Sequence, residues 1–199
     1  MSILTRISRR PRLYNWLHAL GVVNAYSQTH PEERACLCRH ASQLRSAVEI
    51  GTFMGLTAVE LARSLPADAT LYCVDPYPGG GEPLQQIAMR QIARAGAASK
   101  VRMVRADSVG AIASLPAQVD FFFVDGDHSY EGLAADWKVV KQLLRPGGIA
   151  AFHDVVQVEG GGVYSPGSAQ VFSEVISRDP NFTLLETVKS LAVLQRSHI

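Results

Sequence analysis

From residue 46 onward, short apolar runs alternate with longer amphipathic stretches. This alternation predicts β-α-β units, and therefore a parallel sheet with helices on its faces. Each apolar run is followed closely by Gly, Asp or Pro, which is typical of a buried strand that ends in a turn. The predicted parallel strands are residues 46–50, 70–74, 101–106, 119–124 and 149–152.

The stretches between these runs place apolar residues at helical spacing. One of them carries Leu133, Trp137, Val140 and Leu144, which recur every three or four residues. We therefore expect helices on the faces of the sheet. The predicted helices between the strands are residues 56–65, 84–95, 109–115 and 130–144.

The C-terminal part of the chain changes the pattern. A predicted helix, residues 169–177, precedes two β-like runs, residues 182–187 and 191–194, which only Val188, Lys189 and Ser190 separate. Such a short connection is typical of a hairpin. We therefore expect an antiparallel strand to complete the sheet.

The first 45 residues do not follow the alternation. They hold a group of large apolar residues around Trp16 and a predicted helix, residues 32–44, that Pro31 starts. We interpret residues 1–45 as a helical cap beside a sheet domain of residues 46–199. A chain of 199 residues with 47% hydrophobic content is long enough for one good core and short for two, so we expect a single domain overall.

The charge balance bears on the partner. The 19 Lys and Arg residues against 18 Asp and Glu residues leave a formal net charge of +1. This composition does not indicate a nucleic-acid partner held by bulk electrostatics, so we expect a small-molecule partner. The arginines near the start, among them Arg6 and Arg12, have no long apolar run after them, and we expect no signal peptide and no membrane partner.

The cysteines bear on the compartment. There are three of them, and Cys36 and Cys38 form a C-x-C pair without a second pair to complete a zinc site. The pattern indicates a reducing, cytoplasmic location.

Residues 48–57 are the most informative segment, because their sequence, VEIGTFMGLT, leads from a strand through glycine into a helix. Glycines at that point let the backbone turn tightly and approach a ligand at the carboxyl edge of the sheet. A dinucleotide site would carry G-x-G-x-x-G, whose second glycine approaches the pyrophosphate. Phe53 takes that second position. The turn therefore favours a nucleoside ligand without a pyrophosphate.

The next two predicted strands also end in polar side chains. Asp75 follows the second strand, at the spacing of about twenty residues from the glycines at which a carboxylate accepts ribose hydroxyl protons. Asp107 and Ser108 follow the third strand and suit hydrogen bonds with an adenine amino group. The alternative for Asp107 is a cap on the helix that begins there.

In order and spacing, these residues resemble the class I S-adenosylmethionine-dependent methyltransferases, from about residue 46 to the C-terminus. The sequence EIGTFMG, residues 49–55, is similar to the first motif of that family, Asp75 to its ribose acid and residues 106–108 to its adenine turn. Residues 122–132, FFVDGDHSYEG, and residues 143–149, LLRPGGI, are similar to its fourth strand and to the turn before its fifth.

The resemblance implies a Rossmann-like, doubly wound α/β fold with a seven-stranded, mostly parallel sheet whose last strand is antiparallel. It also implies S-adenosylmethionine as the cofactor. The residues that the resemblance assigns to the cofactor are Glu49, Gly51, Thr52, Phe53, Gly55, Asp75, Asp107, Ser108 and Asp125.

Residues 124–130 and 152–154 look most like a branch of small-molecule O-methyltransferases, which includes the macrocin and rhamnosyl O-methyltransferases and cephalosporin-hydroxylase-like proteins. That branch implies transfer of the methyl group to a hydroxyl oxygen of a sugar, a phenol or another natural product.

A metal is the first possible aid to this transfer. Asp125 ends the fourth strand and His153 and Asp154 end the fifth, where the metal-dependent catechol-type O-methyltransferases carry one acid and an acid-amide pair. Such a set would hold Mg²⁺ or another divalent cation that lowers the pKa of an alcohol, and the histidine favours a softer metal. The alternative is a hydrogen-bonded pair of His153 and Asp154 that shapes the loop.

His128 is the predicted general base, because an imidazole can take a hydroxyl proton as the methyl group transfers in line. Its alternative role is that of a helix-start histidine bonded to backbone. The glycine-rich loop of residues 159–167 is either a lid over the acceptor or an exposed linker.

Three other functions stay open at this point. The chain is alternatively an NAD-dependent oxidoreductase, a binding module that holds the cofactor without catalysis, or a methyltransferase for protein or nucleic acid. A homodimer through the apolar segment around Trp16 is a further possibility.

Overall fold

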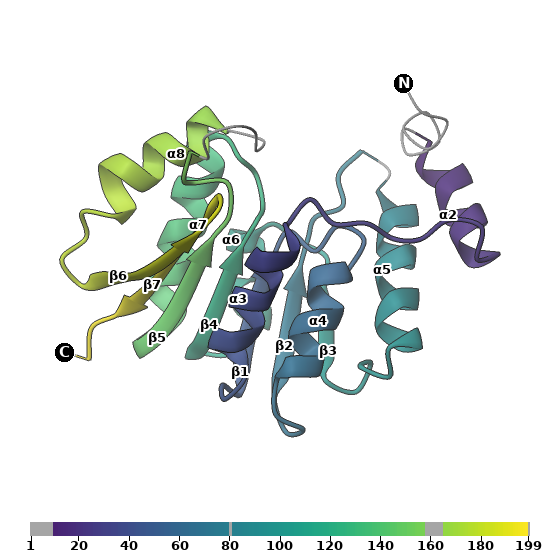
Figure 1. The fold of residues 1–199 in the computed structure, drawn as a ribbon, viewed down its shortest axis with the longest axis horizontal. Coiled ribbons are helices and arrows are strands. Elements are labelled where there is room, and N and C mark those ends of the chain that lie inside the picture. Colours follow the sequence, from purple (N-terminus) through teal and green to yellow (C-terminus); the bar gives the residue numbers. More distant parts are fainter. Residues whose placement is uncertain (1–9, 80, 158–164, 199) are drawn as a thin grey trace.

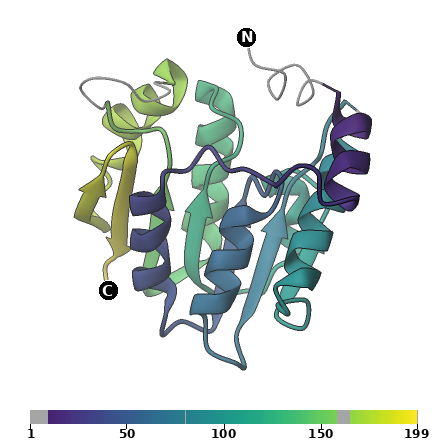
Figure 2. The ribbon, with the colours of Figure 1, turned by 45° about the vertical axis from the view of Figure 1, so that its right-hand side comes forward.

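The computed structural model describes residues 10–79, 81–157 and 165–198. In these ranges, one mixed sheet has seven strands in the order β3-β2-β1-β4-β5-β7-β6, with helices on both faces (Figures 1 and 2). The strands are β1 (Ser46–Ile50), β2 (Thr70–Val74), β3 (Val101–Val104), β4 (Val119–Val124), β5 (Leu144–Phe152), β6 (Phe182–Val188) and β7 (Leu191–Arg196). Strands β1 to β5 pair in parallel, and β7 is antiparallel to both β5 and β6. The predicted fold class is confirmed.

The helices divide between the two faces of the sheet. Helices α3 and α4 cover one face, and α7 covers the other. Helix α2 packs on α5 at the β3 end of the sheet, and α8 packs on α7 near the β6 end (Figure 1). The described helices are α2 (Pro11–Ala19), α3 (Pro31–Ala41), α4 (Leu56–Ser64), α5 (Glu82–Arg94), α6 (Ser108–Ala111), η1 (Ile112–Ser114), α7 (Tyr130–Leu143), α8 (Pro166–Val171) and the π-helical η2 (Phe172–Ile176).

Strand β4 shows why the central strands are apolar throughout. Phe121 and Phe123 belong to the core cluster under α3 and α4, whereas Phe122 belongs to the cluster under α7. All three rings are fully buried. Because successive side chains of a strand point to opposite faces, a strand that helices cover on both sides has no polar face.

Several predicted bounds differ from the structure. Strand β3 ends at Val104, because the N–H of Ala106 donates back to the Val104 carbonyl oxygen (3.2 Å) in a local turn. Strand β5 begins at Leu144 rather than at residue 149, since a register shift lets Leu144 pair with Val119 ahead of the proline and glycines. The predicted helix of residues 109–115 is divided into α6 and η1.

The N-terminal segment packs closely on the sheet domain. Helix α3 begins at Pro31 as predicted and buries Cys36, Leu37 and Ala41 in the core cluster that α4 shares. The domain boundary at residue 45 stays a prediction. In the described parts of the chain, no helix combines the length and the apolar character needed to cross a membrane. Most of the predicted lid, residues 159–164 of 159–167, lies outside the described residues.

Candidate active site

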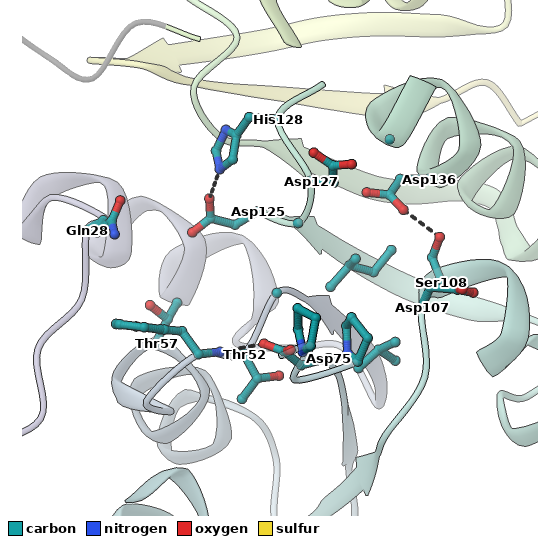
Figure 3. A pocket seen from close by; sticks show the side chains of 18 of the residues that line it. Gln28, Thr52, Thr57, Asp75, Asp107, Ser108, Asp125, Asp127, His128 and Asp136 are labelled. Carbon is teal, nitrogen blue, oxygen red and sulfur yellow. Dashed lines mark hydrogen bonds and ion pairs between the residues drawn. The ribbon is translucent and has the colours of Figure 1, made fainter. Parts of the chain in front are cut away.

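A cavity of about 710 Å³ opens at the carboxyl ends of the parallel strands (Figure 3). Its walls come from the residues that follow β1 to β4, from residues 26–28 and from α7. The sheet pairing continues one residue beyond the strands, since Gly51 N–H donates to Val74 (2.9 Å) and Asp125 N–H donates to Ile50 (2.8 Å). This pairing places the first residue after each strand side by side on the cavity floor.

The glycine turn after β1 brings two backbones together. Gly51 has φ +91°, and a Cβ there would lie 1.9 Å from the Asp125 carbonyl oxygen. Gly55 has φ +77°, and its Cβ would lie 2.9 Å from the Ala88 Cα. Phe53 also takes a positive φ, 49°, which a bulky side chain rarely adopts. The turn therefore has a strained conformation at the edge of the cavity.

Asp75 connects the glycine turn after β1 to the segment after β2. One carboxylate oxygen accepts the N–H of Phe53 (2.9 Å) and the other accepts the N–H of Tyr77 (2.7 Å). The Tyr77 hydroxyl donates to the Phe53 carbonyl oxygen (3.1 Å). Asp75 lines the cavity. Each carboxylate oxygen has two lone pairs, so each can accept one further hydrogen bond from a ligand.

The residues after β3 lie on another side of the cavity (Figure 3). Asp107 caps α6, because its Oδ1 accepts the N–H of Gly110 (2.7 Å). Ser108 donates its hydroxyl to Asp136 of α7. Burial raises the pKa of Asp136 to about 6.

The sequence reasoning missed Asp136. The available signal was its position, since this acid stands beside Trp137 and three residues after Leu133, on the apolar stripe of a helix.

Glu49 lies behind the cavity rather than in its wall. It is fully buried, and among the described residues neither of its carboxylate oxygens has a hydrogen-bond partner. Burial raises the pKa of Glu49 to about 8. Thr52, which lines the cavity, also has an unpartnered hydroxyl within that part of the chain. Two polar side chains beside the glycine turn are thus without partners.

Acidic Asp125 and basic His128 lie together on one side of the cavity (Figure 3). The His128 Nε2 lies 3.5 Å from Asp125 Oδ1, and its Nδ1 lies 3.7 Å from Asp154 Oδ2. The backbone carbonyl oxygen of His128 accepts hydrogen bonds from Ser165 (2.9 Å) and Ser168 (3.1 Å). The imidazole therefore lies between two carboxylates at the cavity wall, and α8 and its N-cap Ser165 contact its backbone.

His153 lies deeper, next to this pair. It is 6% exposed, and it does not line the cavity. Its Nδ1 lies 3.0 Å from Asp125 Oδ1 and its Nε2 lies 3.1 Å from Glu33 Oε2. Burial alone would lower the pKa of His153, but the hydrogen bonds with Asp125 and Glu33 raise it to about 10.

Glu33 was also missed by the sequence reasoning. An acid in the first turn of a helix is ordinary, and nothing in the sequence relates it to a residue 120 positions away. Burial alone would raise the pKa of Glu33, but the hydrogen bonds from His153 and the His30 N–H lower it to about 2.

The predicted metal ligands do not fit a metal as arranged. Both ring nitrogens of His153 already face carboxylates, so ligation would break a buried contact. In the described residues, the group whose ligand atoms all lie within 4.8 Å of one another is Cys36, His40 and Glu186, on α3 and β6. Both oxygens of Glu186 accept from Arg39 at 2.8 Å, which explains that group as an ion pair.

Comparison with known proteins defines the class. Residues 48–155, more than half of the chain, match a family described as methyltransferase domains. The chain belongs to this family of methyltransferase domains. The resemblance to the class I methyltransferases that its motifs carry is confirmed.

Individual relatives are more distant. The chain is 27% identical over 129 residues to the catechol O-methyltransferase of Mycobacterium tuberculosis. The match covers 64% of this chain and 55% of that protein. It is 26% identical over 118 residues to a flavonoid 3',5'-methyltransferase of Vitis vinifera. That match covers 56% of this chain and 48% of the relative. The chain spans about half the length of these curated relatives.

The fold has solved counterparts as well. It is similar to that of the O-methyltransferase TomG of Streptomyces achromogenes, solved in complex with SAM, with a TM-score of 0.66 and 19% identity over 94% of this chain and 90% of that one. At this identity the likeness establishes the fold.

Proposed function

We propose that the protein is an S-adenosylmethionine-dependent O-methyltransferase that acts on a hydroxyl group of a small molecule. The observation that carries this proposal is the cavity at the carboxyl ends of β1, β2 and β4, with Asp75 at the glycine turn and His128 facing Asp125, in a member of a methyltransferase family. Ligands of open α/β sheets bind at this edge.

The residues around the glycine turn fit the cofactor. The absence of a side chain at Gly51 leaves its backbone in close contact with that of Asp125, and the unpartnered Thr52 hydroxyl lines the same wall. The buried Glu49 carboxyl behind it would be stabilised in its charged form by a nearby cation. S-Adenosylmethionine carries an ammonium and a sulfonium cation, so its methionine end suits this part of the site.

The other predicted residues fit the nucleoside. Asp75 would accept the ribose hydroxyls, and Ser108 with Asp107 would lie near the adenine. Asp136 joins this proposed set, because its carboxylate lies on the same wall and holds the Ser108 hydroxyl. The proposed cofactor residues are Glu49, Gly51, Thr52, Phe53, Gly55, Asp75, Asp107, Ser108, Asp125 and Asp136.

The chemistry requires an oxygen nucleophile near the methyl group. S-Adenosylmethionine, when bound, supplies a sulfonium methyl group that such an oxygen can displace in line. His128 would take the hydroxyl proton of the acceptor on its ring, and Asp125 and Asp154 would stabilise the imidazolium that results. The cavity walls would hold the acceptor in line and exclude water.

The acceptor is proposed to be phenolic. The Tyr26 ring packs edge-on against Phe53 at the cavity wall, with centroids 5.3 Å apart. An aromatic acceptor would pack favourably against such rings. The names of the relatives, a catechol and a flavonoid methyltransferase, support this acceptor class.

Binding measurements test the proposal. We expect S-adenosylhomocysteine at 100 times its Kd to raise the Tm by about 5 to 10 °C, whereas NAD leaves the Tm unchanged. Thermal-shift titration checks both ligands, and turnover of catechol and quercetin separates an enzyme from a binding module. A shift with NAD and none with S-adenosylhomocysteine would contradict the proposal.

Asp75→Asn tests the ribose contact together with the backbone contacts of Asp75 at the glycine turn. We expect this change to weaken S-adenosylhomocysteine binding by about 10- to 100-fold, because a neutral amide is a poorer hydrogen-bond acceptor than a carboxylate. Isothermal titration calorimetry measures the Kd. The matched control is Asp68→Asn, which removes an exposed carboxylate before β2, at the opposite edge of the sheet. Equal affinities of the two variants would remove Asp75 from the cofactor site.

The location and the oligomeric state of the protein are also proposals. We propose a reducing, cytoplasmic location, on the basis of the free cysteines Cys36, Cys38 and Cys73. A homodimer through the N-terminal segment is also proposed, since Trp16 of α2 and Leu20 directly after it are 60% and 59% exposed. Light scattering of the purified protein tests the dimer.

A further inference from the structure

We propose that Glu33 is a positioning residue of the acceptor site, which holds His153 so that His153 holds Asp125 beside His128. This inference rests on the function proposed above. It assigns a role to the N-terminal segment, which the sequence reasoning left without one. It also replaces the predicted metal at this edge of the sheet with a set of hydrogen bonds between side chains of the chain itself.

Glu33 occupies a fixed position. Its side chain is 2% exposed, and its Oε1 accepts from both the N–H (3.0 Å) and the hydroxyl (2.8 Å) of Ser190. Its Oε2 accepts the N–H of His30 (2.7 Å) and lies 3.1 Å from His153 Nε2. The carboxylate therefore joins the start of α3, the turn between β6 and β7, and the end of β5. A carboxylate with four hydrogen bonds and almost no exposure has one available orientation.

His153 links Glu33 to Asp125 at the cavity wall. Its ring lies between Glu33 and Asp125, within 3.1 Å of each, and the edge of the Phe123 ring borders it. Because both neighbours are carboxylates, both ring nitrogens act as donors, and the ring cannot rotate without losing one bond. Asp125 Oδ1 is thereby held where it also lies 3.5 Å from His128.

The same segment also reaches Asp125 directly. The Thr29 hydroxyl donates to Asp125 Oδ2 (3.4 Å), and Thr29 is 2% exposed. Residues 29–33 thus hold both oxygens of Asp125, one directly and one through His153. The proposed base faces a carboxylate whose position the N-terminal segment determines.

This arrangement separates two effects of a change at Glu33. Glu33 and His153 are not in the cavity wall, and they reach the proposed cofactor set through Asp125, so the Kd for the cofactor is expected to change far less than kcat when Glu33 changes. The alignment of Asp125 with His128 is expected to suffer, and a misplacement of about 1 Å near reacting groups costs about 100-fold in turnover. A purely structural role would instead lower stability and leave kcat per folded molecule unchanged.

The variants are Glu33→Ala and Glu33→Gln, with Glu32→Gln as the matched control. Glu32 stands next in the same helix turn and is 58% exposed. We expect Glu33→Ala to lower kcat by about 100-fold with catechol or quercetin as the acceptor, while the Kd for S-adenosylhomocysteine changes by about threefold or less. Glu33→Gln keeps an acceptor oxygen and should restore part of kcat. The control should behave as the unchanged protein.

A second measurement does not depend on turnover. In ¹⁵N-histidine-labelled protein, His153 should show two exchange-protected ring N–H signals, and Glu33→Ala should lose the Nε2–H signal. Two unchanged signals in Glu33→Ala, or a folded Glu33→Ala variant with full kcat, would overturn the proposal. If neither the unchanged protein nor any variant bound S-adenosylhomocysteine, the proposed function would fail. The two ring N–H signals would still show whether Glu33 holds His153.

Discussion

His128→Ala should lower kcat by about 10²- to 10⁴-fold, while the Kd for S-adenosylhomocysteine stays within a factor of two or so. The imidazole lies at the cavity wall between Asp125 and Asp154, where it is 37% exposed and accessible to an acceptor hydroxyl. Among the described residues that line the cavity, no other histidine is available to take the acceptor proton. Steady-state kinetics with a saturating cofactor measure the effect.

The control for this experiment is His40→Ala. His40 lies on α3, where it pairs with Glu186, outside the cavity wall. This variant should retain kcat. If His128→Ala kept full turnover on an acceptor that the unchanged protein methylates, His128 would not be the base, and the acceptor proton would pass directly to Asp125 or to water.

Gly51→Ala should destabilise the protein by about 3 to 5 kcal/mol and abolish cofactor binding. The added Cβ would lie 1.9 Å from the Asp125 carbonyl oxygen, and a backbone at φ +91° is unfavourable for alanine. Relief of the clash requires β1 and β4 to separate at the carboxyl edge, where the cofactor is proposed to bind. Urea unfolding monitored by circular dichroism measures the stability.

Gly96→Ala is the matched control, because Gly96 has φ +71° and nothing within 4 Å of its added Cβ. This variant has the unfavourable backbone conformation but no clash, and we expect it to lower the free energy of unfolding by about 1 kcal/mol. Equal destabilisation in the two variants would mean that the close approach of Gly51 to Asp125 has no energetic importance.

Much of the fold follows from local patterns. The predicted strands of residues 46–50, 70–74 and 119–124 have the observed bounds, because each is a short apolar run buried on both faces and ended by Gly or Asp. The start of β5 was not predictable in this way. Its first residues include Pro146 and two glycines, which are poor strand formers, and only the pairing of Leu144 with Val119 extends the strand.

The residues proposed to bind the cofactor could also be found from the sequence. Gly51 and Asp75 directly follow β1 and β2, and Asp107 lies three residues after β3. Parallel strands bring their carboxyl ends to one edge, so order along the chain predicts proximity in space. For Asp107 the sequence left two roles open, a helix cap and a contact with the adenine. In the structure Asp107 caps α6 and also lines the cavity.

The acceptor side depended on tertiary structure. Glu33 and Thr29 belong to a segment outside the β-α-β alternation, and no spacing rule relates them to Asp125 or His153. The packing of α3 against α4 and the sheet brings them there. The sequence by itself determined which strands form and which residues stand at their ends, because those depend on local hydrophobic pattern and turn chemistry. Only the folded chain decided that His153 faces two carboxylates, because that contact depends on how distant segments pack.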